Sequence, residues 1–295
     1  MRIEMIKFLR NLRAEQIRQT YRVLSGFERL PGGRPLLRRM AHWPITAPIL
    51  DLLLGYLRVF DSLREAEVAA RSYTEESHQN PGYSKYLMSL SEAARPSDYA
   101  MLFHMRAMTF KNCKIFDLGG NIGNLFYLYD RYLNLPPDCT WLVYELPAWV
   151  EAGEKLATDR GENRLRFTRK WEDASGADLL IASGSLYYFD TPLAKMVDAL
   201  PKKPPHILIN RTPLIEGPTK ATVQDGRAWM VACVLYNRAE LITAFEAIGY
   251  EVFDTWKAQE HFIKIIGKPE SSALACSGLF LRLRGDLIEK EEGLR

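Results

Sequence analysis

The feature that most constrains the fold is an apolar segment that runs into a glycine-rich turn and then into a helical pattern. Lys114–Asp117 is predicted as a strand, Leu118–Asn124 as the turn, and Leu125–Tyr132 as the start of a helix. Glycines suit such a turn because the backbone must bend tightly and let a ligand approach without a Cβ in the way. The segment therefore predicts an α/β domain with a ligand site at the carboxyl end of its first strand.

Downstream of Lys111, short apolar runs alternate with helical stretches, which is the pattern of βα units and a mostly parallel sheet. Asn237–Ile248 is predicted as an amphipathic helix that Gly249 ends. The last two apolar runs have no helical pattern between them, so we expect a closing antiparallel hairpin. The seven predicted strands are Lys114–Asp117, Trp141–Glu145, Leu165–Thr168, Asp178–Ser183, His206–Asn210, Glu251–Trp256 and Gly278–Leu283.

The chain before Phe110 carries a different pattern. Its apolar residues recur about every 3.6 positions and strand signals are nearly absent, so residues 1–108 are predicted as a helical region and 109–295 as the ligand-binding domain. Residues 1–40 carry a local charge of +7, against +3 for the whole chain. This segment is either a basic solvated helix face or an amphipathic helix on an anionic membrane surface. The apolar residues of that helix would be Met5, Ile6, Phe8, Leu9 and Leu12.

The composition argues against several other classes of protein. A net charge of +3 is too small for a nucleic-acid footprint across the whole surface. The four cysteines show neither CxxC nor CxxxH spacing, so we expect reduced thiols, a cytoplasmic protein and no zinc site. The first residues lack the pattern of a signal peptide, and the longest apolar stretch, Trp43–Leu57, is too short to span a bilayer.

The glycine spacing distinguishes between the possible cofactors. A dinucleotide fingerprint that starts at Gly119 needs glycine at positions 121 and 124, and both are asparagine here. The acidic-x-G-x-G-x-G pattern of methyltransferases is matched by Asp117, Gly119 and Gly123, with Asn121 in place of the middle glycine. Asparagine tolerates left-handed backbone angles better than most residues, so the turn can keep its shape.

A carboxylate follows the second predicted strand. Glu145 lies about 20 residues beyond Gly123, where an acidic side chain can accept hydrogen bonds from both hydroxyls of a ribose. The alternative is a glutamate that merely caps the helix beginning near Pro147.

Two more segments are placed at the same edge by topology, because ligands of open α/β sheets sit over the carboxyl ends of the strands. Trp171 follows the third strand and either covers a face of the adenine or is an ordinary surface or core residue. Ser183 and Gly184 end the fourth strand and are expected to face the methionine end of the cofactor.

Two segments resemble S-adenosylmethionine (SAM)-dependent methyltransferases in particular. Asp117–Gly123 is similar to the D-V-G-G-G-x-G of small-molecule O-methyltransferases and to the D-V-G-A-N-I-G of FkbM-like methyltransferases. Glu145–Glu151 resembles the D-L-P-x-V-V-E that follows the second strand of the O-methyltransferases. With Phe60–Ala66 and Asn210–Glu216, the pattern resembles a methyltransferase family commonly encoded beside bacterial surface-glycan or secondary-metabolite genes.

The resemblance covers roughly residues 58–283. It implies a Rossmann-like sheet of seven strands and methyl transfer from SAM to an oxygen, or less favoured a nitrogen, of a small molecule or glycan precursor. It also implies that the N-terminal helices cap the acceptor or form a homodimer. The expected SAM-binding residues are Asp117, Gly119, Gly120, Asn121, Gly123, Glu145, Leu146, Trp171, Ser183 and Gly184.

The sequence offers several candidates for the residue that would take a proton from the acceptor. The O-methyltransferases carry a catalytic histidine just after the fourth strand, and the comparable position here is nearest Tyr187. A phenol with a pKa of about 10 is a poor base near neutrality, so Tyr187 and Tyr188 are expected to orient the acceptor, or only to pack. His104 and His261 are the other candidate bases, and each is also readily a structural histidine.

Arg211 follows the fifth strand at its carboxyl end. A guanidinium there can bind a carboxylate or phosphate in a bidentate manner, which predicts an anionic acceptor. The alternative is a structural arginine paired with Glu216. Val231–Tyr236 and Gln259–Ala275 are expected to border the acceptor pocket.

Two other functions compete with methyl transfer. The missing histidine supports a non-catalytic protein of the same fold that acts as a binding or assembly module. A nicotinamide oxidoreductase is disfavoured by the glycine spacing and by the closing hairpin.

Overall fold

A computed structural model of the 295-residue chain describes residues 16, 19–20, 22–24, 26–43, 45–46, 49–50, 56–70, 91–225, 230–265 and 267–285. The chain divides into two compact units. Unit 1 comprises Met1–Ser77, Ile215–Asn237 and Phe262–Leu274, and unit 2 comprises His78–Leu214, Arg238–His261 and Ala275–Arg295.

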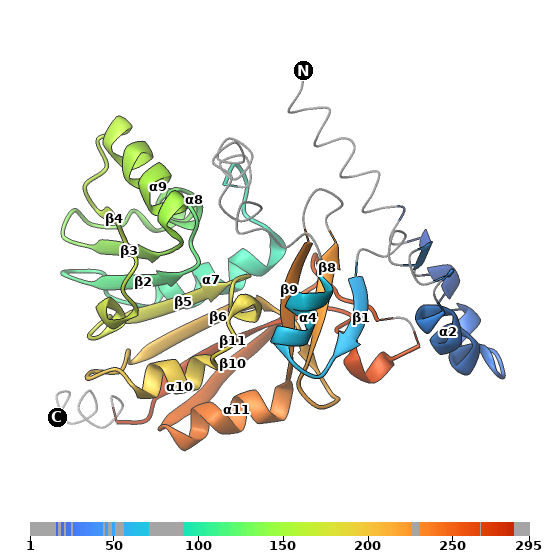
Figure 1. Ribbon diagram of the computed structural model, residues 1–295. Helices are drawn as coiled ribbons and strands as arrows, with labels where there is room; N and C mark the ends of the chain where they lie inside the picture. Colours follow the sequence, from blue (N-terminus) through green and yellow to red (C-terminus); the bar gives the residue numbers. More distant parts are fainter. Residues whose placement is uncertain are drawn as a thin grey trace. The chain divides into compact units, whose positions relative to one another are not determined.

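Unit 2 contains a seven-stranded sheet (Figure 1). Its order is β10-β11-β6-β5-β2-β3-β4, in which β2 to β6 are parallel and β11 is antiparallel to both β6 and β10. All seven predicted strands and the closing antiparallel hairpin are confirmed. The strands are β2 (Lys114–Leu118), β3 (Thr140–Tyr144), β4 (Leu165–Thr168), β5 (Leu179–Ser183), β6 (His206–Thr212), β10 (Tyr250–Ala258) and β11 (Cys276–Leu283).

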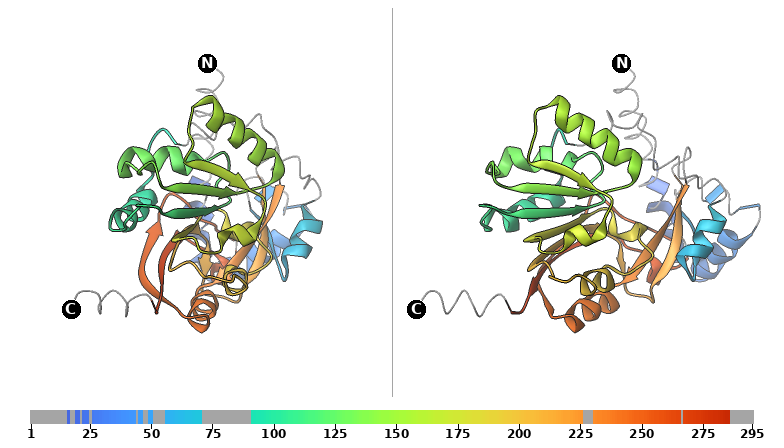
Figure 2. Two further views of the ribbon diagram at one scale, coloured as in Figure 1. Left: turned by 90° about the vertical axis from the view of Figure 1, so that its left-hand side faces the viewer. Right: turned by 60° about the vertical axis from the view of Figure 1, so that its left-hand side comes forward.

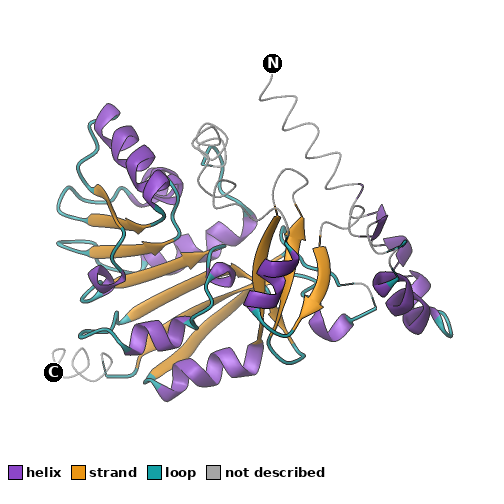
Figure 3. Ribbon diagram, viewed as in Figure 1, coloured by secondary structure: helices purple, strands orange, loops and turns teal. Residues whose placement is uncertain are grey.

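Helices cover both faces of this sheet (Figures 2 and 3). The core on one face joins alternate strand residues, such as Ile115 and Trp141, to apolar residues of α7, α8 and α9. On the other face, Trp171 packs edge-on against Phe116 and bonds to a carbonyl of α10. The predicted helix over 237–248 is confirmed as α11. The helices are α7 (Pro96–Arg106), α8 (Asn124–Leu133), α9 (Pro147–Asp159), α10 (Leu193–Asp198) and α11 (Arg238–Ala247).

Unit 1 is built around a second sheet that sequence analysis missed. Its strand order is β1-β8-β9-β7, and β8 pairs antiparallel with both β1 and β9. Ile215, Leu235 and Ile263 form a small buried core with neighbouring apolar residues. The elements are α2 (Gly33–His42), β1 (Tyr56–Phe60), α4 (Leu63–Ala69), β7 (Leu214–Ile215), β8 (Lys220–Asp225) and β9 (Met230–Asn237).

The division into units differs from the predicted boundary near residue 108. Strand β1 lies in the region expected to be helical, and α7 belongs to the unit of the large sheet. Val231–Tyr236, expected beside the acceptor, is part of β9 in unit 1. The proposed roles of the N-terminal region in capping and dimer formation stay predictions.

Two sequence interpretations concern the first residues and the cysteines. The apolar residues of the predicted membrane-surface helix, from Met5 to Leu12, lie outside the described residues. No helix within the described ranges is long and apolar enough to cross a bilayer.

All four cysteines are free thiols, and the Sγ atoms of Cys113 and Cys139 lie 3.1 Å apart.

Candidate functional site

The loop that follows β2 has an unusual backbone. Gly119, Asn121 and Gly123 have φ angles of 71°, 54° and 84°, which lie in the left-handed region. A Cβ on Gly119 would come within 2.5 Å of Ser185, and one on Gly123 within 2.5 Å of Leu165. Both glycines are therefore required by backbone angle and by space. Asn121 adopts the left-handed conformation, as predicted for it.

Asp117 lies directly beneath this loop and is almost fully buried, with 1% of its surface exposed. Its Oδ2 accepts a hydrogen bond from Nε1 of Trp141 at 3.0 Å, while Oδ1 has no partner among the described residues. Burial is the main cause that raises the pKa of Asp117 to about 7, and the bond from Trp141 opposes it. The carboxyl group thus offers one buried oxygen that lacks a hydrogen-bond donor.

Glu145 joins the end of β3 to the glycine-rich loop. Its Oε1 accepts the backbone N–H of Asn121 at 3.1 Å, and its Oε2 accepts that of Leu146 at 2.7 Å. Burial raises the pKa of Glu145, and these two backbone bonds oppose the rise. The N-cap of α9 is Leu146, without a side-chain bond, so Glu145 is not the capping residue considered as its alternative role.

Trp171, which was predicted to cover the adenine, is held in place by its packing contacts. It lies in a short 3₁₀ turn, Trp171–Ala174, and its Nε1 donates to the carbonyl of Met196 at 3.0 Å. Its ring stands edge-on to Phe116 and to Tyr144, with centroids 5.5 and 6.2 Å away. These contacts fix the indole, and its place beside an adenine stays a prediction.

The end of β5 is attached to both neighbouring strands. The N–H of Gly184 donates to the carbonyl of Asn210 at 2.9 Å, and the hydroxyl of Ser185 donates to the carbonyl of Leu118. Tyr187 and Tyr188 follow in a 3₁₀ turn, with ring centroids 4.4 Å apart. The structure therefore brings the predicted residues of β5 against the loop after β2 and against the end of β6.

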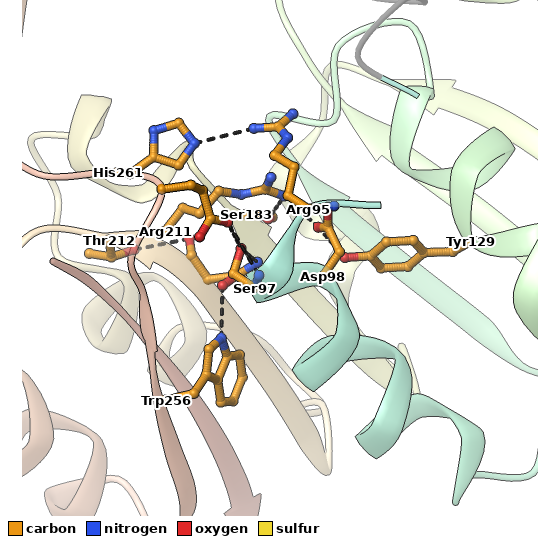
Figure 4. A network of polar contacts seen from close by, with 11 residues as sticks. Arg95, Ser97, Asp98, Tyr129, Ser183, Arg211, Thr212, Trp256 and His261 are labelled. Atoms are coloured by element: carbon orange, nitrogen blue, oxygen red, sulfur yellow. Dashed lines mark hydrogen bonds and ion pairs between the residues drawn. The ribbon is translucent and has the colours of Figure 1, made fainter. Parts of the chain in front are cut away.

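Arg211 lies in β6, at the carboxyl edge of the sheet, and is the centre of a buried polar network (Figure 4). Its side chain is 5% exposed, and its Nη2 donates to Oδ1 of Asp98 and to Oγ of Ser183, both at 2.8 Å. Its carboxylate partner is Asp98, and not Glu216, the partner considered in the alternative sequence interpretation. Nη1 of Arg211 has no partner among the described residues.

Asp98 is fully buried near the start of α7 and binds three groups. Besides Arg211, it accepts the hydroxyl of Tyr129 at 2.8 Å and the backbone N–H of Arg95 at 2.9 Å. Sequence reasoning missed Asp98. The Arg95–Asp98 segment, with proline at the first helical position, is a helix-start signal, but it does not reveal a partner on a distant strand.

His261 and Arg95 lie beside Arg211 (Figure 4). Nη1 of Arg95 donates to Nε2 of His261 at 3.3 Å, so the neutral ring carries its proton on Nδ1. Burial, followed by the charges of Arg211 and Arg95, lowers the pKa of His261 to about 4, while Glu260 and Asp98 oppose this. His261 is therefore neutral near pH 7.

A second part of the network connects α7 to the edge strands. Oε1 of Glu260 accepts the N–H and the hydroxyl of Ser97, and Oε2 of Glu260 has no partner among the described residues. The amide of Asn210 donates to Ser97 at 3.3 Å and accepts Nε1 of Trp256 at 2.9 Å. These bonds hold the start of α7 against the ends of β6 and β10.

His104 is not brought together with these residues. Its Nε2 lies 2.7 Å from Oδ2 of Asp254, and its ring packs against Phe280 at 4.6 Å. Phe280 pairs with Leu208 in the middle of β6, away from the carboxyl end. The contacts of His104 are those of a structural histidine.

No group of three or more metal-ligating side chains occurs in the part of the chain that the structure describes.

No protein-family model matches the chain, and no curated protein matches it. Similar solved structures include a mitomycin 7-O-methyltransferase, at 14% identity and a TM-score of 0.45 over 83% of this chain and 70% of that one. The Burkholderia thailandensis 1,6-didemethyltoxoflavin-N1-methyltransferase aligns at 17%, with a TM-score of 0.43 over 75% and 89% of the two chains. A SAM-dependent methyltransferase from Aquifex aeolicus aligns at 13% sequence identity and a TM-score of 0.43, over 69% of this chain and 98% of that one. Likenesses at this level establish no activity for this chain.

Proposed function

We propose that the protein binds SAM at the carboxyl ends of β2 and β3 and transfers its methyl group to an acceptor at the ends of β5 and β6. The observation that carries this proposal is the hydrogen bond from the N–H of Asn121 to Glu145. It places a carboxylate at the glycine-rich loop, where an adenosyl ligand needs an acceptor for its ribose hydroxyls.

The residues present fit such a ligand. Each carboxylate oxygen of Glu145 accepts one backbone N–H and keeps lone-pair capacity for a hydroxyl. The unpartnered Oδ1 of Asp117 suits the ammonium group of the methionine part. Gly120 lets the loop lie directly against Asp117, because a Cβ there would come within 2.4 Å of Oδ2 of Asp117.

Methyl transfer requires mainly that the acceptor atom be held in the right position. Bound SAM would supply a methyl group on a sulfonium: the acceptor atom would bond to the methyl carbon as the carbon–sulfur bond breaks and SAH leaves. The chain's part is to hold that atom about 3 Å from the methyl carbon and to exclude water. We assign the orienting role to Tyr187 and Tyr188, in the turn directly after β5. The proposed acceptor atom is an oxygen, with nitrogen the less favoured option, on a small molecule or glycan precursor.

Calorimetry tests the binding step with four ligands: SAM, S-adenosylhomocysteine (SAH), NAD and NADP. We expect heat from the two adenosyl ligands only, and binding of NAD alone would overturn the proposal. Mass spectrometry of acceptor pools incubated with the protein and SAM then tests transfer. SAH binding with no methylated product would favour the non-catalytic alternative. The cytoplasmic location and the homodimer stay predictions.

A further inference from the structure

The buried guanidinium of Arg211 has hydrogen-bond donors that no neighbouring described residue accepts. A guanidinium has five N–H donors, and buried donors in proteins are normally bonded. Nη2 of Arg211 is bonded to Asp98 and Ser183, whereas Nη1 is buried without a partner among the described residues. Arg211 also has a φ of 54°, a left-handed conformation that a non-glycine residue keeps only where its surroundings require it. Such outliers cluster at functional sites.

A second guanidinium lies close to the first. Burial, followed by the charge of Arg211, lowers the pKa of Arg95, whereas Asp98, Glu260 and Tyr129 oppose this. Within the described residues, the partner of the Arg95 guanidinium is the ring of His261, which is neutral and offers a single lone pair. An oxyanion bound here would satisfy Nη1 of Arg211 and offset the repulsion between the two arginines.

The position of the two arginines points to the methyl acceptor. Ser183, which Arg211 bonds, precedes Gly184, and the hydroxyl of the next residue, Ser185, bonds to Leu118 at the start of the glycine-rich loop. The guanidinium is thus connected to the proposed SAM site through one short turn. The same turn leads into Tyr187 and Tyr188.

We propose that Arg95 and Arg211 together bind an oxyanion, a carboxylate or a phosphate, that the methyl acceptor carries. This inference rests on the proposed function and adds the chemical class of the acceptor. His261 reports on the site, since it faces two cations, Arg95 and Arg211, and two carboxylates, Glu260 and Asp98. A bound oxyanion offsets the cations and must raise the pKa of His261.

NMR titration of the His261 ring in the full chain tests the inference, with SAH present and with inorganic phosphate or acetate as the probe. We expect phosphate or acetate to raise the pKa of His261 saturably, and the more effective probe distinguishes the two sources of oxyanion. Arg95→Gln should weaken this response at least tenfold, and Arg211→Lys should weaken it as well. Arg106→Gln, at the exposed end of the same helix α7, should leave the response unchanged.

The outcomes separate this inference from the proposed function. Normal SAH binding with no effect of either oxyanion on His261 would overturn the oxyanion site and leave the SAM site intact. An oxyanion response that persists in Arg95→Gln would overturn the assignment to these arginines. Absence of SAH binding would remove the proposed function whatever the phosphate result.

An independent observation concerns the described part of residues 22–49 in unit 1. Half of the fourteen exposed large apolar residues of the described chain lie there, among them Val23 and Ile45 at 71% and 69% exposure. The only carboxylate of this segment, Glu28, is paired with Lys264 at 3.2 Å. Exposed arginines alternate with the apolar residues, namely Arg22, Arg29, Arg34 and Arg39, while Arg38 is ion-paired with Glu270 at 3.2 Å.

We infer that this segment binds an anionic lipid surface. Clustered exposed apolar residues mark interaction sites, and arginines among them complement anionic headgroups. Flotation with phosphatidylcholine vesicles, with and without about 30% phosphatidylglycerol, tests this. We expect binding to the anionic vesicles only, weakened by about 0.5 M salt and by Ile45→Ser, but not by Val68→Ser on the exposed face of α4. Dimers in solution without vesicle binding would overturn the inference.

Discussion

The backbone N–H of Asn121 donates to Oε1 of Glu145 at 3.1 Å, although the two residues are 24 positions apart in the sequence. One lies in the loop after β2 and the other directly after β3, and these strands pair in parallel from Lys114 to Leu118. The bond exists because parallel neighbours present their carboxyl ends at the same edge of the sheet.

Glu145→Gln should weaken binding of SAH by about 10- to 100-fold. The amide keeps the shape but makes only neutral hydrogen bonds to the two ribose hydroxyls, a loss of about 1 kcal/mol for each. Calorimetry measures the affinity. Glu151→Gln, on the exposed side of α9, is the matched control and should bind as the native protein does. Equal affinities of both variants would show that Glu145 does not hold the ligand.

Gly123→Ala should lower the free energy of unfolding by about 2–5 kcal/mol. The left-handed backbone costs an alanine about 1–2 kcal/mol, and the Cβ would overlap Leu165, which adds about 1–3 kcal/mol. Gly161→Ala is the control, because Gly161 has a φ of 65° with open space around it. Denaturant titration should show the smaller loss for Gly161→Ala. Equal losses of unfolding free energy would mean that the side chain of Leu165 moves aside without destabilising the protein.

The sheet and the loop could be predicted because their signals are local. The strand Lys114–Asp117 and its glycine-rich turn are contiguous, and Glu145 ends the next apolar run. The β8–β9 pair was missed because Met230–Asn237 is mostly apolar without alternation, although Asp225-Gly226 is a hairpin signal. The five residues of β1 are too few to show a period.

The polar network could not be predicted in the same way. Asp98 and Arg211 are 113 positions apart and come from a helix and a strand, so no local pattern relates them. A lone arginine after a strand has several possible partners, and the sequence left an anionic acceptor and the nearby Glu216 as alternatives. Only the packing of α7 against β6 selects Asp98.

Asp98→Asn should therefore lower the free energy of unfolding by about 3–5 kcal/mol. The neutral amide leaves the buried charge of Arg211 without its counter-ion, which costs far more than one neutral hydrogen bond. Tyr129→Phe removes a single bond to the same carboxylate and should cost about 1 kcal/mol. Denaturant titration of both variants measures the difference. Similar losses would show that the ion pair contributes little.

The buried carboxyl group of Asp117 should make stability depend on pH. The folded state holds the proton up to a pKa of about 7, whereas the unfolded chain loses it near 3.8. Between these values the folded state binds more protons than the unfolded state, so the contribution of Asp117 to stability falls as the pH rises.

Asp117→Asn removes this contribution, because the amide does not titrate. The native protein should therefore lose stability relative to Asp117→Asn as the pH rises from about 4 to about 7, and the difference should level off above that range. Denaturant titrations at several pH values measure it. The exposed Asp138→Asn variant should follow the native profile. If Asp117→Asn also follows the native profile, the carboxyl group has the same pKa in the folded and unfolded chain, and a bonded donor must offset its burial.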